Sequence, residues 1–110
     1  MKELEKEFCT ILQVEEESLK EAVPLVAQRT GELKDKNLVV DLQKIDHPGQ
    51  GEVESFLPIS NNHRENGKSF VVVNKGVNIS DLPEELVVVP TLLEAEDIIQ
   101  MDEIQRELGF

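Results

Sequence analysis

The chain has 110 residues, of which 39% are hydrophobic and 31% charged, a composition typical of one soluble globular domain rather than a disordered polypeptide. Its formal net charge of -12, from 23 acidic and 11 basic residues, argues against direct binding to nucleic acid or to an anionic membrane surface. The single cysteine, Cys9, excludes an internal disulfide, and its apolar neighbours predict a buried, unreactive thiol.

The first seven residues are charged and lack the apolar segment of a signal peptide. No apolar run in the sequence approaches the roughly 18 residues of a membrane span. We therefore expect a cytoplasmic protein whose residues 1–110 form a single domain.

The first predicted elements are a strand and a helix. Residues 7–14 read as a strand that is apolar on both faces. Ser18 and Glu21 have the spacing of a capping box, which indicates a helix start. Pro24 conflicts with that start, because it lacks an amide hydrogen and clashes with the preceding turn. The helix either begins with Pro24 in its first turn, which we favour, or kinks there.

The middle of the chain predicts two further strands around a second helix. Residues 37–42 form a short β-branched strand, and residues 46–51 have the composition of a loop. A helix is expected over residues 52–66, bent at Pro58. Residues 69–73 give the clearest strand, apolar on both faces as a central parallel strand would be.

The last third predicts a connection, a strand and a long helix. Residues 77–85 connect to a strand at 86–89, with a single turn expected at Pro83. Thr91 and Glu94 form a second capping box at the start of the last helix. The face that we expect to be its apolar face consists of Ala95, Ile98, Met101, Ile104 and Leu108. Alternation of this kind predicts an α/β fold with about four mostly parallel strands covered by about three helices.

Residues that carry chemistry are sparse. His47 and His63 are too isolated for a metal cage, and the single Cys9 adds nothing to a zinc site. The sequence holds no phosphate-binding glycine loop. Paired acids occur at helix starts and on predicted solvent faces, where the helix dipole and solubility account for them. We therefore predict no catalytic residues, no metal and no cofactor, and we do not expect an enzyme; a nucleophile pair of Cys9 with either histidine is the weaker alternative.

The order of these elements and several motifs resemble the STAS family, the sulfate-transporter and anti-sigma-factor-antagonist domains. The run Asn37 to Leu42 is similar to the family's Val-Val-Asp-Leu strand, and Val89 to Ala95 is similar to its strand, Pro-Thr and acid-opened helix. The resemblance covers about residues 7–108. It implies a STAS-like sheet covered by helices and a regulatory partner, an anti-sigma factor or a related kinase.

In that family, a Ser or Thr at the start of the second helix is phosphorylated by the partner kinase, and the added charge changes docking. The matching positions here hold no hydroxyl residue, and the nearest, Ser55, lies inside the predicted helix. Either the phosphoswitch is lost and a binding surface is kept, which we favour, or the register differs by several residues. The resemblance thus implies a docking loop and helix start formed by His47, Gly49, Gln50, Gly51 and Glu52.

The end of the chain, from Leu86 to Thr91 and on through Leu108, also resembles small STAS-like proteins of Bacteroidetes-type bacteria, some of which carry the name ribonuclease Z. That hydrolase has a His-x-His-x-Asp-His metal motif, which this sequence lacks. Two hypotheses therefore lead: a non-enzymatic regulatory module that binds another protein, or an accessory subunit of an RNA-processing enzyme such as ribonuclease Z. A small enzyme with an apolar cleft lined by perturbed carboxylates is a third.

Overall fold

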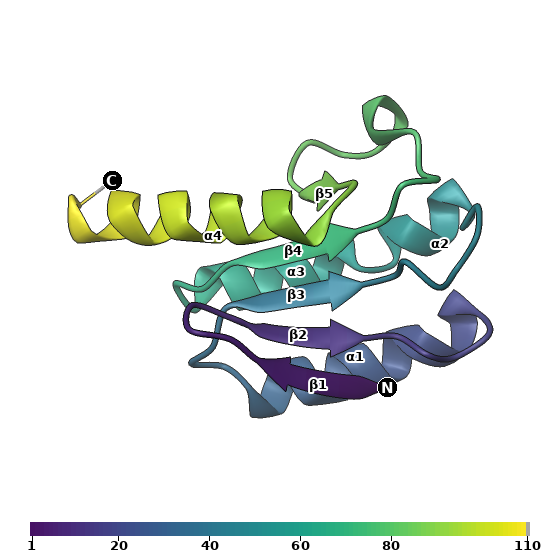
Figure 1. Ribbon diagram of the computed structural model, residues 1–110, viewed down its shortest axis with the longest axis horizontal. Coiled ribbons are helices and arrows are strands. Elements are labelled where there is room, and N and C mark those ends of the chain that lie inside the picture. The colour runs from purple at the N-terminus through teal and green to yellow at the C-terminus, as the bar shows by residue number, and fades with distance from the viewer. Residues whose placement is uncertain (110) are drawn as a thin grey trace.

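The computed structural model describes residues 1–109 as an α/β fold built on one five-stranded, mostly parallel sheet (Figure 1). The strands lie side by side in chain order, from β1 to β5, and only β1 is antiparallel to its neighbour. In order along the chain, the elements are β1 (Lys2–Glu5), β2 (Thr10–Gln13), α1 (Leu19–Glu32), β3 (Leu38–Asp41), α2 (Gln50–Glu54), α3 (Leu57–Glu65), β4 (Phe70–Val73), the 3-10 helix η1 (Ile79–Asp81), β5 (Val88–Val89) and α4 (Leu92–Glu107).

The first strand pair corrects the sequence prediction. Of the strand expected over residues 7–14, only Thr10–Gln13 form a strand, β2. The charged segment before it forms a further strand, β1, which pairs with β2 so that Lys2 lies opposite Gln13. All four residues of β1 are exposed, so the sequence has no hydrophobic pattern there that would predict a strand. The Arg29 guanidinium of α1 hydrogen-bonds to Glu3 and ties this edge strand to the helix below it.

Helix α1 begins before Pro24, so the preferred later start was wrong. Ser18 is the N-cap, and its hydroxyl accepts a hydrogen bond from the Glu21 amide at 3.4 Å. Leu19 and Ala22, before the proline, are fully buried. The cap and this burial outweigh the one backbone hydrogen bond that Pro24 removes from the helix.

The single helix expected over residues 52–66 is two helices, α2 and α3. The break falls at Ser55 and Phe56, and Pro58 occupies the first turn of α3. At that position its missing amide hydrogen has no partner to lose, so the proline favours a new helix start over a bend.

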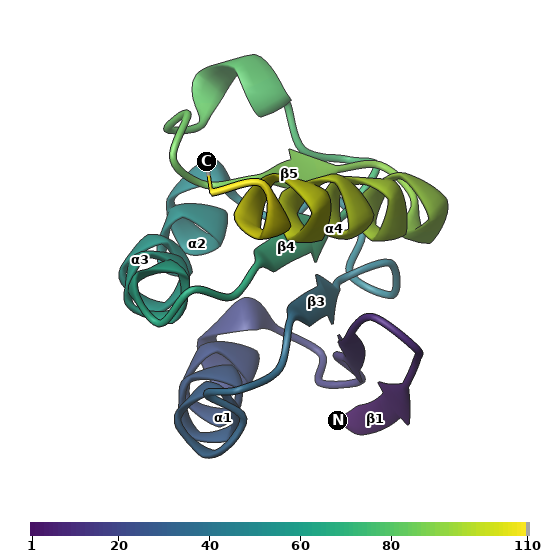
Figure 2. The same cartoon turned by 90° about the vertical axis from the view of Figure 1, so that its left-hand side faces the viewer.

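The helices cover both faces of the sheet. Figure 2 shows α1, α2 and α3 on one face and α4 alone on the other. Alternate residues of each central strand point to opposite faces, so Val72 packs beneath α1 to α3 whereas Val71 packs beneath α4. Two apolar clusters result, which explains why β3 and β4 are apolar on both faces.

The segment between β4 and β5 contains η1 and a turn closed by the Leu86 amide on the Pro83 carbonyl, which confirms the predicted turn. The strand predicted at 86–89 is only Val88–Val89. Helix α4 begins as predicted, with the Thr91 hydroxyl accepting from the Glu94 amide at 3.1 Å.

The predicted inner face of α4 was right in its first part and wrong beyond it. Ala95 is buried and Ile98 packs partly buried against the same core, which Ile99 joins, whereas Met101, Ile104 and Leu108 are exposed. The helix is about 24 Å long and the strands beneath it about 13 Å, so its last turns extend past the sheet (Figure 1). Polar contacts, described below, decide which side of those turns faces the protein.

Candidate docking surface

The predicted docking loop leaves the carboxyl end of β3 and is held there by Asn74 at the end of β4. The Asn74 side-chain amide donates to the Leu42 carbonyl at 2.9 Å and to the Ile45 carbonyl at 3.0 Å, and its oxygen accepts from the Gly76 amide at 2.7 Å. Asn74 is buried, so these bonds fix the loop after β3 against the loop after β4.

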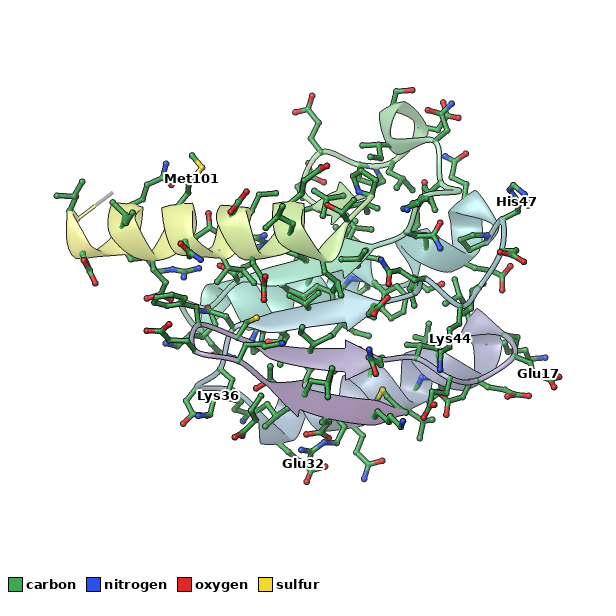
Figure 3. The ribbon with its side chains drawn as sticks, in the orientation of Figure 1. Glu17, Glu32, Lys36, Lys44, His47 and Met101 are labelled. Atoms are coloured by element: carbon green, nitrogen blue, oxygen red, sulfur yellow. The ribbon has the colours of Figure 1, made fainter. Side chains whose placement is uncertain are left out.

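His47 stands at the turn of this loop with a φ of 46°, a left-handed conformation that non-glycine residues seldom adopt. Its side chain is exposed and projects beside α2 (Figure 3). A Cβ at Gly76 would come within 3.2 Å of the His47 amide nitrogen, a tight contact that would require the loop to shift slightly, so glycine suits this close approach. A cleft of about 540 Å³ lies between the two loops.

The start of α2 is exposed and is anchored by the residues around it. Gly49, the N-cap, and the next three residues through Glu52 are all exposed, and the Gln50 side chain is anchored by donating to the Asp81 carbonyl. Directly after them, Val53 and Phe56 are fully buried in the apolar cluster beneath α1 to α3. The structure therefore brings all five predicted site residues to one exposed loop and helix start.

A groove of about 410 Å³ runs beside this helix start, between α1 and α2. Helix α1 lines it with the apolar side chains of Leu19, Val23 and Pro24, and α2 contributes Glu52 and Ser55. Ser55, predicted to lie within a helix, is the exposed C-cap of α2, and its hydroxyl donates to the Gly51 carbonyl at 3.2 Å.

Sequence reasoning missed two parts of this surface. Asn74 and Gly76 directly follow a strand that runs parallel to β3, and the carboxyl ends of parallel strands meet at one edge of a sheet. Their place beside the docking loop could therefore have been predicted from the sequence. The α1 wall of the groove gave no comparable signal, because Pro24 was assigned to a helix start.

Of the chemistry-bearing residues considered in the sequence, Cys9 and His63 lie apart from this surface, whereas His47 belongs to it. Cys9 is buried on the α4 face, which confirms the prediction of a buried thiol; burial raises the pKa of this thiol to about 11, with Glu96 adding to the shift. His63 lies on α3, on the opposite face of the sheet from Cys9 (Figure 2). His47 lies beyond the carboxyl end of β3, whereas Cys9 lies just before the start of β2, at the other end of the strands. The structure thus brings neither histidine to Cys9.

Three carboxyl groups elsewhere, those of Glu3, Glu16 and Glu103, have lowered pKa values. The Arg29 hydrogen bond lowers the pKa of Glu3, and the Asn37 side-chain amide lowers that of Glu103.

Within residues 1–109, no cluster of three or more His, Cys, Asp or Glu side chains has the geometry to hold a metal ion. In the same range, no helix is long and apolar enough to cross a membrane.

A scan of known protein-family models and a search of curated proteins each gave no match to this chain.

Proposed function

We propose that this chain is a STAS-like regulatory module that binds another protein through the loop of residues 46–49, the start of α2 and the groove between α1 and α2. Support comes from the mostly parallel α/β sheet and from the Val39 to Leu42 segment at β3. Further support comes from the order strand, loop, helix and strand after β3, although two helices, α2 and α3, stand where one was expected.

The observation that carries the proposal is the exposed helix start beside an apolar groove. Gly49 to Glu52 are exposed, yet they are followed by fully buried side chains that hold the backbone in place. A preorganised surface of this kind loses little conformational freedom on binding. The apolar side chains of α1 supply the centre of a contact, and Lys20, Glu52 and Ser55 supply its polar rim.

The same site works without phosphorylation in this proposal. Positions 49–52 carry no hydroxyl group, and Glu52 places a fixed negative charge in the first turn of α2. The partner is a regulatory protein of the anti-sigma-factor or kinase type that accepts this charge constitutively.

The test is affinity capture from the native cell, comparing the wild-type chain with Glu52→Lys. Glu7→Lys is the matched control, since it makes the same charge change between β1 and β2, at the opposite end of the strands. We expect the wild-type chain and the control to retain a kinase-type regulatory protein and Glu52→Lys to lose it, with binding of the purified partner weakened about tenfold or more.

Two results would contradict the proposal. Equal retention by all three chains would show that the α2 start is not the docking site. Retention of an RNA-processing hydrolase in place of a regulatory protein would favour the accessory-subunit hypothesis. Intact-mass measurement after incubation with the captured kinase and ATP tests whether the phosphoswitch is lost. A phosphate on residues 46–55 would show that the chain is still phosphorylated and would contradict that loss.

A further inference from the structure

A second exposed surface lies on α4, on the opposite face of the sheet from the docking groove (Figure 2). Four apolar side chains of this helix and its C-cap face solvent: Leu93 is 69% exposed, Met101 60%, Ile104 56% and Leu108 67%. They recur at helical spacings of three, four or eight residues, so they lie along one side of the helix, here called the α4 stripe; Met101, Ile104 and Leu108 are neighbours in it, and Leu93 lies two turns before them. Met101 projects away from the strands in Figure 3.

The orientation of α4 is fixed by polar contacts on its other side. The Ser69 hydroxyl donates to the Asp102 carboxylate at 2.6 Å and accepts from the Arg106 guanidinium at 3.0 Å. The Asn37 side-chain amide donates to Glu103 at 2.8 Å. Because these three residues of α4 are held against the sheet, the helix cannot roll to bury the α4 stripe.

The charges around the stripe have one sign. The exposed charged residues of α4, all of whose residues are described, are Glu94, Asp97 and Glu107, and Asp97 lies within the stripe between Leu93 and Met101. The one basic residue of the helix, Arg106, points to the sheet side. Exposed apolar residues on one side of a helix whose own exposed charges are all acidic are unusual on a surface that contacts only water.

We propose that the α4 stripe is a docking site for a basic amphipathic helix of a partner protein, with apolar residues at i, i+3, i+4 and i+7 and Lys or Arg on their flanks. Such a helix would cover the stripe and pair with the three acids around it. A second copy of this chain is disfavoured, because it would bring the same acids and a net charge of -12 against themselves. This site is independent of the α2 docking surface.

A designed peptide tests the proposal directly. The probe is a helical peptide of about 18 residues made of Leu, Lys and one Trp, with the Leu residues on one face. This chain contains neither Trp nor Tyr, so the emission of the peptide's Trp reports its environment alone. We expect a blue shift on binding and a dissociation constant in about the micromolar range.

Two variants and a control locate the contact. Ile104→Glu and Met101→Glu each add an acid to the stripe, and each is expected to weaken peptide binding about tenfold or more. Leu25→Glu makes the same kind of change at an exposed site on α1 and is expected to leave binding unchanged. All three positions are exposed, so circular dichroism should show the wild-type fold.

Several outcomes would overturn the proposal. One is equal binding of a scrambled peptide of the same composition, and another is equal weakening by Leu25→Glu. Equal binding of the peptide with Glu in place of Lys would refute the charge requirement. A wild-type dimer in sedimentation velocity that Ile104→Glu dissociates would show that a second copy covers the stripe. Each experiment uses the purified chain alone, so it can fail without affecting the α2 docking proposal.

Discussion

Ser69 shows how one small buried side chain positions a whole helix. It precedes β4, is fully buried, and joins the sheet to α4 through Asp102 and Arg106. The Arg64 guanidinium of α3 lies 3.9 Å from the same Asp102 carboxylate. This carboxylate of α4 therefore also forms an ion pair with a helix on the other face of the sheet. Charge-assisted hydrogen bonds of this kind are stronger than neutral ones, particularly when partly shielded from water.

Ser69→Ala is expected to lower the free energy of unfolding by about 1–2 kcal/mol, because Asp102 and Arg106 each lose a hydrogen-bond partner. Urea denaturation followed by circular dichroism measures this change. Ser55→Ala is the control: its hydroxyl is exposed, and we expect a change within about 0.5 kcal/mol. If both variants unfold at the same urea concentration, Ser69 does not hold α4 in place.

At the level of elements, α1 contains a proline at an interior position, where proline destabilises a helix. Pro24 lies inside the helix and leaves the Lys20 carbonyl without its usual backbone donor. It also contributes to the wall of the α1–α2 groove, where its ring is exposed. A residue that weakens its helix yet lines a candidate binding surface is consistent with a functional role for that surface.

Pro24→Ala is therefore expected to stabilise the chain by about 1–2 kcal/mol, since the regained helical hydrogen bond outweighs the greater freedom of the unfolded chain. The urea midpoint should rise with an unchanged slope. Gln28→Ala, an exposed substitution in the same helix, should shift the midpoint little. A midpoint for Pro24→Ala at or below that of the wild type would contradict this account.

How much could be read from the sequence also differs from element to element. The central strands β3 and β4 were predicted closely, because runs such as Phe70 to Val73 are apolar on both faces. The charged β1 gave no such signal, since its pairing depends on the β2 backbone and on Arg29. The face of α4 was misassigned because its anchors, Asn37 and Ser69, lie far away in the sequence.

At the scale of the whole molecule, the two candidate surfaces lie on opposite faces of one sheet. The α1–α2 groove and the α4 stripe are separated by the central strands, so two partners could be bound at once without contact between them (Figure 2). The strong negative charge discourages self-association while favouring a basic partner at α4. Taken together, the two proposals describe a chain that binds one partner on each layer of helices.

The stability of the whole fold in mild acid is expected to depend on His63. Its ring is fully buried against Phe70, and its Nε2 donates to the Lys36 carbonyl at 2.6 Å. Burial lowers the pKa of His63, and the neighbouring positive charge of Arg64 adds to the effect, although the hydrogen bond to Lys36 opposes it. In the unfolded chain the ring has its ordinary pKa of about 6.5.

The sign of the pH dependence follows from these two states. Below about pH 6.5 the unfolded chain binds a proton that the folded chain resists, so acidification favours unfolding. The contribution of His63 is therefore complete above about pH 6.5 and is lost as the pH falls below it. The lowered pKa values of Glu3 and Glu103 act in a separate, more acidic range, below the ordinary carboxyl value of 4.5.

Free energies of unfolding in urea, measured between about pH 7.5 and 5, should fall with acidification for the wild-type chain and stay nearly level for His63→Gln. The comparison uses the slopes of the two curves, because the substitution itself changes stability at every pH. His47→Gln is the matched control: its side chain is exposed, so its curve should run parallel to that of the wild type. If the His63→Gln curve were also parallel to it, the acid sensitivity would have to come from groups other than the buried imidazole.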